Sequence, residues 1–162
     1  MARRETIRQA APADRDALAG MCEALWPEAT AAAHARALAA RLAGAPPGTL
    51  PSIIFVAETA AGELAGFVEI GLRSHADGCD PARPVGFVEG WFVAEHHRRR
   101  GVGARLLRVA ERWARTQGCV ELASDTWIDH DVSQRVHEAL GFEVVDRCVH
   151  YRKRLTEGPV PT

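Results

Sequence analysis

Residues 97–103 have the sequence His-Arg-Arg-Arg-Gly-Val-Gly, and an apolar, amphipathic stretch follows from Ala104 to Trp113. The segment before them, Val85 to Val93, alternates like a strand, so the stretch predicts a strand joined to a helix by a glycine-containing turn. The two glycines let the backbone approach an anion closely, and the free N–H groups of the first helical turn point toward it. The three arginines add positive charge. The segment is therefore typical of a phosphate-binding turn.

The spacing Arg98-x-x-Gly101-x-Gly103 differs from two other phosphate-binding patterns. It is not the Rossmann pattern G-x-G-x-x-G, and it lacks the Gly-Lys-Ser/Thr that opens the helix of a Walker P-loop. A basic loop that only caps a solvated helix has the same composition. Taken alone, the turn leaves both interpretations open.

Composition indicates one ordinary globular domain. The chain has 162 residues, of which 47% are hydrophobic and 25% charged, so we expect a single domain over residues 1–162 with a flexible tail over residues 156–162. The formal net charge of −1 lacks the basic excess of proteins that bind nucleic acid through its phosphates. We find no signal peptide and no apolar run long enough to span a bilayer, which predicts a cytoplasmic protein without a membrane partner.

Cysteine spacing gives no sign of a metal site. The four cysteines are far apart, without a C-x-x-C pair or other metal-ligand spacing: Cys22, Cys79, Cys119 and Cys148. We therefore expect free, mostly buried thiols and no metal.

Hydrophobic periodicity predicts an α/β or α+β layered domain. Helices are expected from Pro12 to Trp26, and over Thr30–Leu42, Gly103–Gln117 and Asp131–Leu140. Strands are expected over Thr6–Gln9, Ile53–Thr59, Leu64–Leu72, Val85–Val93, Glu121–Asp125, Glu143–Asp146 and Val149–Arg154, with a hairpin joining the second and third.

This order of elements, with the arginine-glycine turn, resembles the GNAT acetyltransferases over roughly residues 5–155. His137-Glu138-Ala139-Leu140-Gly141-Phe142 agrees, because it stands where that superfamily usually has Tyr-x-x-x-Gly-Phe. The resemblance implies a mixed, mostly antiparallel sheet with helices on both faces, and acetyl-CoA as the cosubstrate.

More specific strings resemble the aminoglycoside 6'-N-acetyltransferases of the AAC(6')-I type. They are Leu25-Trp26-Pro27, residues 75–80 (HADGCD), residues 88–93 (VEGWFV), Ala123-Ser124-Asp125-Thr126 and Tyr151-Arg152-Lys153-Arg154. The resemblance implies transfer of an acetyl group to an amino group of an aminoglycoside, antibiotic resistance, and a homodimer that uses the last strands.

The same resemblance implies roles for individual residues. Substrate contacts fall on Trp26, His75, Glu89, Asp125 and Asp146. Coenzyme contacts fall on the main chain of Phe92, Val93 and Ala94, on the turn Arg98, Arg99, Arg100, Gly101, Val102 and Gly103, and on His130, which stands where an asparagine is common.

For catalysis we expect direct attack of the amine on acetyl-CoA without a covalent enzyme intermediate or a metal. Glu89 is the expected base and Asp125 orients the amine, while His137 takes the place of the tyrosine that often protonates the departing thiolate. Carboxylates in the chain also suit a polycationic amine through charge-assisted hydrogen bonds.

Structural roles remain open for these residues. Trp26 also fits a core aromatic at a helix end, Asp125 a helix cap, and His137 a packing residue. Asp77, Asp80, Asp129 and Asp131 are typical loop or cap acids, whereas Glu89 in an apolar strand is costly unless it is paired. Two other functions are also open: acetylation of another amine, such as a polyamine, peptide or protein amine, and a non-catalytic acyl-CoA-binding module.

Overall fold

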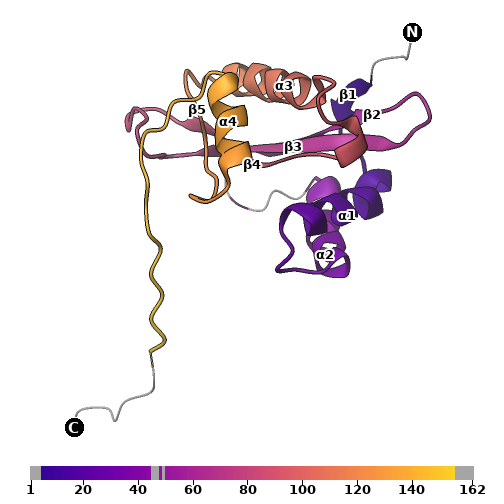
Figure 1. Ribbon diagram of the computed structural model, residues 1–162, viewed down its shortest axis with the longest axis horizontal. Coiled ribbons are helices and arrows are strands. Elements are labelled where there is room, and N and C mark those ends of the chain that lie inside the picture. Colours follow the sequence, from indigo (N-terminus) through magenta and orange to yellow (C-terminus); the bar gives the residue numbers. More distant parts are fainter. Residues whose placement is uncertain (1–4, 45–47, 49, 156–162) are drawn as a thin grey trace.

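The computed structural model describes residues 5–44, 48 and 50–155, and its centre is a five-stranded sheet (Figure 1). Each of the first three strands pairs antiparallel with the next, and the last strand pairs parallel with the fourth. In sheet order the strands are β1 (Thr6–Gln9), β2 (Ser52–Glu58), β3 (Leu64–Arg73), β4 (Val85–Val93) and β5 (Leu122–Ser124). The predicted mixed, mostly antiparallel sheet is thus confirmed.

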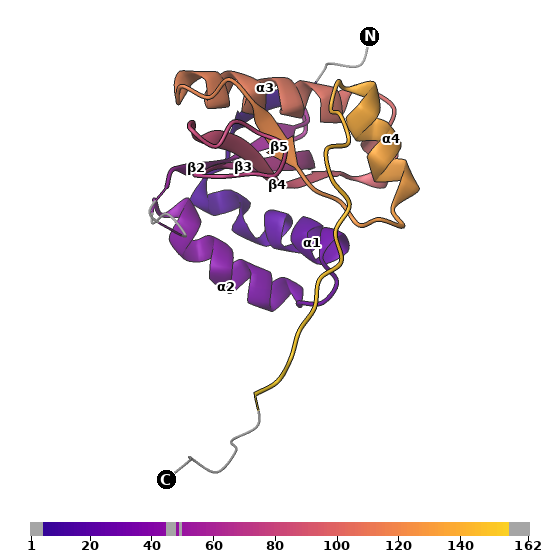
Figure 2. The same cartoon turned by 90° about the vertical axis from the view of Figure 1, so that its left-hand side faces the viewer.

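Helices cover both faces of this sheet (Figure 2). A 3-10 turn η1 (Pro12–Asp14), α1 (Arg15–Leu25) and α2 (Ala31–Leu42) lie on one face. The other face carries η2 (Glu95–His97) and α3 (Val102–Thr116), with α4 (Asp131–Ala139) near β5. Among the described residues, no helix has the length and apolar character that crossing a membrane requires.

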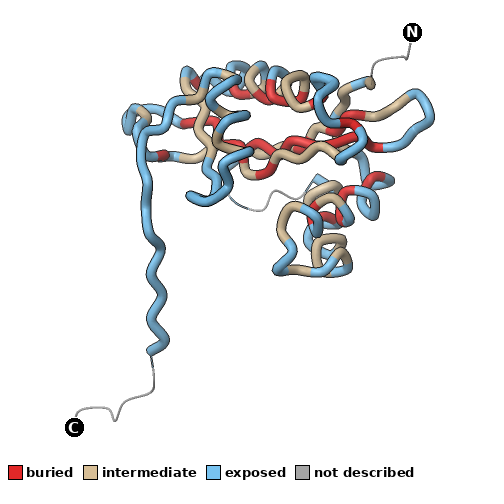
Figure 3. Tube along the Cα trace, in the orientation of Figure 1, coloured by how far each residue is buried: buried red, intermediate tan, exposed pale blue. Residues whose placement is uncertain are grey.

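The sheet is buried between two apolar clusters (Figure 3). On one face, α3 presents Leu106, Leu107 and Ala110 to Val68 and Ile70 of β3, as the helical spacing of these residues predicts. On the other face, Leu18 and Cys22 of α1 and Leu38 of α2 form a cluster with Val56 of β2 and Phe67 of β3. The strand ends and turns that form the candidate site described below are therefore attached to a rigid, well-packed sheet.

Sequence signals located most elements closely. The bounds of β1 and β4 are those predicted, and the hairpin of β2 and β3 is present. Thr30 caps α2, because its hydroxyl oxygen accepts a hydrogen bond of 3.2 Å from the Ala33 N–H.

The two strands predicted over Glu143–Asp146 and Val149–Arg154 are wrong. Residues 143–155 contain no strand and leave the body as an extended arm, on which Tyr151 is 92% exposed (Figure 1). Alternation of apolar residues favours a strand, but a strand also needs a neighbour for its N–H and C=O groups. This arm has none among the described residues. The tail predicted over residues 156–162 lies outside the described residues.

All four cysteines are free, as predicted. Burial raises the pKa of the Cys22 thiol to about 11 and also raises that of Cys119. Neither thiol is therefore an activated nucleophile.

Candidate functional site

A β-bulge in β4 organises the site around Glu89. Glu69 of β3 pairs with Gly90, whereas the next residue, Ile70, pairs with Val88, so Glu89 is an extra residue without a partner in β3. Bulges of this kind redirect side chains. Here the result is that Glu89 and Gly90, although consecutive, both face α1 and α2.

Trp26, at the end of α1, covers Gly90. A Cβ built on Gly90 would lie 2.4 Å from Cη2 of Trp26, so only glycine leaves room for the indole. The half-buried ring also packs near Phe67 and His34, and the Trp26 carbonyl lies 3.2 Å from Nε2 of His34. The structure therefore places Trp26 over Gly90, the residue after Glu89, and packing explains part of the tryptophan's role.

An open hollow of about 280 Å³ lies beside Glu89 on the same face. Glu89 accepts hydrogen bonds of 3.0 and 2.7 Å from Arg73, and the buried Glu69 forms an ion pair with Arg41 of α2. The lining residues are Arg41, Pro51, Ser52, Glu69, Gly71, Leu72 and Glu89. The two acids of the hollow thus already have cationic partners within the chain.

Asp125 follows β5 directly, at the level of the bulge. Ser124, the last residue of β5, pairs with Val88, so Asp125 and Glu89 each come next on two parallel neighbouring strands. Asp125 is exposed and is not part of a helix. The register therefore places both predicted acids at the same edge of the sheet.

His137 lies on the opposite face of β4, in a fixed orientation. Its Nδ1 is 2.8 Å from the Ser133 carbonyl and its Nε2 is 2.9 Å from the Ser124 hydroxyl, while Trp91 and Phe142 pack edge-on against the ring. The Ser133 carbonyl can only accept a hydrogen bond. In the neutral ring, Nδ1 therefore carries the proton, and Nε2 accepts a hydrogen bond from the Ser124 hydroxyl. His137 can donate a proton through Nε2 only as imidazolium.

β4 has an open edge beyond the bulge. Its pairing with β5 covers Gly86–Val88 only, so the edge from Glu89 onward has no strand neighbour on that side among the described residues. The predicted coenzyme contacts are Phe92 and Val93, at the end of β4, and Ala94 directly after it. Two of their main-chain groups already have hydrogen-bond partners. The Ala94 N–H donates to the Ala65 carbonyl, and the Val93 carbonyl accepts a hydrogen bond of 2.9 Å from Arg98 Nε.

The turn after β4 has the geometry of an anion site. Arg99 and Gly101 adopt left-handed conformations, with φ of 59° and 76°, and Gly101 occupies the N-cap of α3 without a side-chain hydrogen bond. The first N–H groups of α3 are therefore free of intrahelical partners and carry the positive end of the helix dipole. The three arginines at positions 98–100 are all exposed.

Gly103 allows the helix start to sit close to β4. A Cβ on Gly103 would lie 3.3 Å from Trp91, whose indole N–H is buried without a hydrogen-bond partner in the described part of the chain. Val102, the first residue of α3, is buried in the apolar cluster between α3 and the sheet. The turn is thus held rigidly against the open edge of β4, as binding of a pyrophosphate-bearing coenzyme requires.

Three other predicted residues lie at the rim. His75 is exposed in the loop before β4, 3.6 Å from Asp77, and His130 is the exposed N-cap of α4 without a side-chain hydrogen bond. Asp146 lies on the arm, beside Val145, whose side chain covers Gly78 of the same loop as His75. None of the three lines the hollow beside Glu89.

Sequence reasoning did not single out Glu69, Arg41, Arg73 or Ser124. Glu69 carried the same signal as Glu89, an acid inside an apolar strand, and its burial costs free energy unless a cation pairs with it. Its partner Arg41 gave no local signal, because the pair joins β3 to a helix 28 positions earlier in the chain.

Known proteins match this chain in sequence. Residues 18–142 match the acetyltransferase (GNAT) family. The aminoglycoside N(6')-acetyltransferase type 1 of Stenotrophomonas maltophilia is 39% identical over 150 residues, which are 93% of this chain and 94% of that protein. The protein of the same name from Klebsiella aerogenes is 40% identical over 134 residues, covering 83% and 86%.

Solved structures agree. AAC(6')-Iy in complex with the bisubstrate analogue CoA-S-monomethyl-acetylneamine superposes with a TM-score of 0.81 at 36% identity, covering 94% of this chain and all of that one (100%). AAC(6')-Ih from Acinetobacter baumannii gives a TM-score of 0.82 at 26% identity, covering 94% and 99%. These matches show that the chain belongs to the acetyltransferase (GNAT) family and is an acetyl-CoA-dependent N-acetyltransferase, and the glycine-containing turn and the bulged strand agree with them.

Proposed function

We propose that this acetyltransferase modifies the 6'-amino group of aminoglycoside antibiotics and so confers resistance to them. The observation that carries the proposal is the bulge in β4, which turns the Glu89 carboxylate to the same face of the sheet as Gly90, where the Trp26 indole packs. An aminoglycoside combines sugar rings with several ammonium groups, and an aromatic ring next to carboxylates suits both. The names of the relatives described above support the same substrate.

The substrate amine meets acids from three elements. Glu89 on β4 and Asp125 after β5 are level in the sheet, and Asp146 lies on the arm beside the loop that carries His75. Trp26 provides the apolar face. Because an aminoglycoside is a polycation, acids spread over this rim orient it more firmly than a single acid would.

The coenzyme is assigned to the other part of the open edge. The free N–H groups at the start of α3, with Gly101, Val102 and Gly103 and the arginines at 98–100, hold its pyrophosphate. The main chain of Phe92, Val93 and Ala94 holds the pantetheine arm through the groups that are still free, since the Ala94 N–H already donates to Ala65, and His130 at the start of α4 adds a side-chain contact. Acetyl-CoA supplies the acetyl group.

Proton transfer falls to Glu89, Asp125 and His137. Glu89 takes a proton from the attacking amine, directly or through water, and shares its oxygens with Arg73 while doing so. Asp125 orients the amine. His137, as imidazolium, donates from Nε2, and the Ser124 hydroxyl at 2.9 Å fixes that nitrogen.

The arm of residues 143–155 is assigned to contact with a second copy of the chain. Val149, Tyr151 and Leu155 of the arm are 73%, 92% and 88% exposed, and His150, Arg152, Lys153 and Arg154 stand between them in the sequence. Within the described part of the chain, β5 is the last strand of the sheet and pairs on one side only, so its other edge offers main-chain groups to such an arm. The protein then works as a homodimer, in the cytoplasm where acetyl-CoA is available.

Release of the free CoA thiol from acetyl-CoA tests the substrate. The amines are kanamycin, tobramycin and gentamicin, with spermidine and a lysine-containing peptide as controls. Turnover with the aminoglycosides alone, with the acetyl group mapped to the 6'-nitrogen, is the expected result. Turnover confined to spermidine or the peptide assigns another amine, and coenzyme binding without any turnover assigns an acyl-CoA-binding module.

A further inference from the structure

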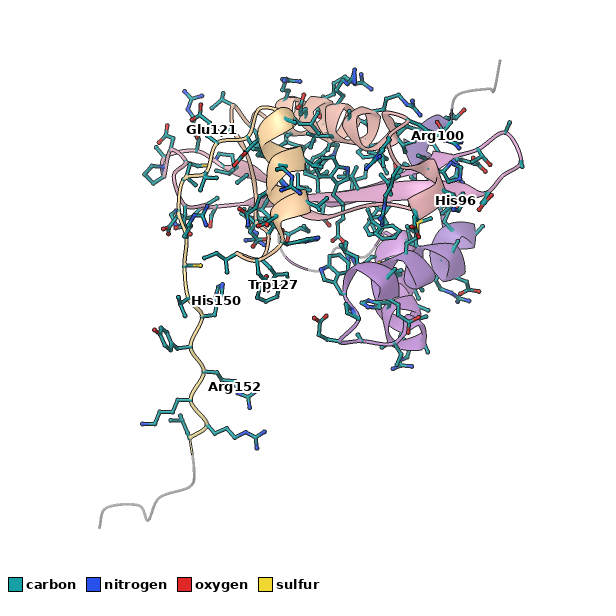
Figure 4. The ribbon with its side chains drawn as sticks, viewed as in Figure 1. His96, Arg100, Glu121, Trp127, His150 and Arg152 are labelled. Atoms are coloured by element: carbon teal, nitrogen blue, oxygen red, sulfur yellow. The ribbon has the colours of Figure 1, made fainter. Side chains whose placement is uncertain are left out.

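Three metal-ligand side chains meet next to the coenzyme turn, outside the site described above. One ligand atom from each of Glu63, His96 and His97 lies within 4.8 Å of the others. The two histidines belong to η2, and Glu63 comes from the turn between β2 and β3, 33 residues earlier. Figure 4 shows His96 at the same end of the molecule as Arg100 of the turn.

His97 is the unusual member of this cluster. It is only 8% exposed, and neither ring nitrogen has a hydrogen-bond partner among the described residues. A buried polar group without a partner costs free energy, so a ligand that satisfies it stabilises the fold. The ring's Nδ1 faces the Glu5 carboxylate at 3.6 Å, which leaves Nε2 for such a ligand.

Glu5 is itself fixed, because Arg105 of α3 forms an ion pair with it. A carboxylate behind a histidine is the arrangement that orients metal-binding histidines: the carboxylate holds one ring nitrogen and the metal takes the other. Arg105 is therefore neutralised by Glu5 rather than opposing a cation at His97.

The remaining two ligands are already close and can adjust. Nε2 of His96 lies 3.3 Å from Oε1 of Glu63, and the two histidine rings are 4.3 Å apart between centroids. Both side chains are exposed, so they can rotate to form bonds of about 2 Å to a common ion. Two imidazoles and one carboxylate suit zinc, with water completing a tetrahedral site.

We propose that Glu63, His96 and His97 bind one zinc ion, with Glu5 as the residue that positions His97. The ion joins the β2–β3 turn to η2, immediately before the arginine turn, and so braces the coenzyme site without entering the reaction. The expectation of no metal rested on cysteine spacing, which carries no information about two histidines and an acid so far apart in the chain.

Untagged full-length protein, stripped with a chelator, is titrated with Zn²⁺ by calorimetry, and its Tm is measured with Zn²⁺ and with Mg²⁺. We expect one zinc per chain and a higher Tm with Zn²⁺ but not with Mg²⁺. His96→Ala and Glu63→Gln abolish both effects, while His75→Ala, at an exposed histidine of another loop, retains them. Glu5→Gln weakens binding by about 10–100-fold.

Co²⁺ gives an independent readout, because its visible absorption reports tetrahedral nitrogen and oxygen ligands. The apo variants' own Tm values show whether each is folded, so a failure to bind is not confused with a failure to fold. Absence of zinc binding in the stripped wild-type protein overturns the proposal, and so does unchanged affinity in both His96→Ala and Glu63→Gln.

Discussion

Arg73 donates two hydrogen bonds, of 3.0 and 2.7 Å, to the two carboxylate oxygens of Glu89, and its guanidinium carbon lies 3.4 Å from the centroid of the Phe87 ring. The carboxylate at the bulge is therefore partly neutralised before any substrate arrives. An ammonium group of the substrate has to compete with Arg73 for the same oxygens, and this competition can be measured.

Substitutions at the two partners should have unequal effects on the use of an aminoglycoside. Glu89→Gln removes a charge-assisted contact worth about 1.5–3 kcal/mol, so kcat/KM for an aminoglycoside should fall by about 10–100-fold. Arg73→Gln frees the carboxylate for the substrate, so KM should stay equal or fall. Steady-state kinetics of both variants decide the point. Equal losses in the two variants would mean that the pair serves structure only.

Gly90→Ala should displace Trp26, since the added Cβ would lie 2.4 Å from the indole. Overpacking of this kind costs about 1–3 kcal/mol, and KM for the aminoglycoside should rise together with the loss of stability. Urea unfolding and kinetics measure the two effects. Gly20→Ala in α1 is the control, because nothing lies within 4 Å of its Cβ position. A normal KM in Gly90→Ala would remove Trp26 from the substrate site.

Gly101→Ala should weaken the coenzyme site specifically. Its φ of 76° is left-handed, which costs alanine about 1–2 kcal/mol, and relief of that strain moves the N-terminus of α3. We expect a higher KM for acetyl-CoA. Gly118→Ala is the matched control: φ is 84°, the position is equally open, and it follows the other end of α3. Both variants lose stability, but a raised KM for acetyl-CoA in both would contradict a special role for the turn.

Asp14 should make stability depend on pH in the acid range. The hydrogen bonds from Arg8 lower the pKa of this buried carboxyl below its usual 3.8, and the Ala11 N–H adds to the effect. A lowered folded-state pKa means that the stabilisation is complete above about pH 4–5 and is lost as pH falls through the folded value.

Asp14→Asn should therefore destabilise the protein by about 2 kcal/mol at pH 7 and by less at pH 3, where part of the stabilisation is already lost. Urea unfolding at both pH values measures the difference. Asp16→Asn, at an exposed acid that pairs with Arg15 on the surface, should change stability little at either pH. A pH-independent loss in Asp14→Asn would show that packing, and not charge, accounts for the effect.

The arm can be tested through the oligomeric state. Val149→Asp combined with Tyr151→Asp places charge at two apolar positions of the arm, and we expect a monomer by light scattering after size-exclusion chromatography. Lys153→Ala and Arg152→Ala leave the arm's apolar residues in place and should preserve the dimer; Figure 4 shows Arg152 on the arm, away from the body. A wild-type monomer, or a dimer that survives the double substitution, would reject this interface.

By itself, the sequence determined most of the local elements and predicted the coenzyme turn. Strands β1 and β4, the capped helix α2 and the glycine-containing start of α3 depend on periodicity, caps and backbone freedom within a few residues, so their signals are local. The resemblance to a family then named the acids.

Only the tertiary structure decided how these parts meet. The bulge that turns Glu89 and Gly90 to one face, the indole of Trp26 over Gly90, and the burial of His97 beside Glu5 all join segments far apart in the chain. The missing strands of residues 143–155 follow the same logic, because a strand is completed by its partner. Pairing and packing across the fold depend on contacts that no window of sequence contains, which is why they could not be predicted from it.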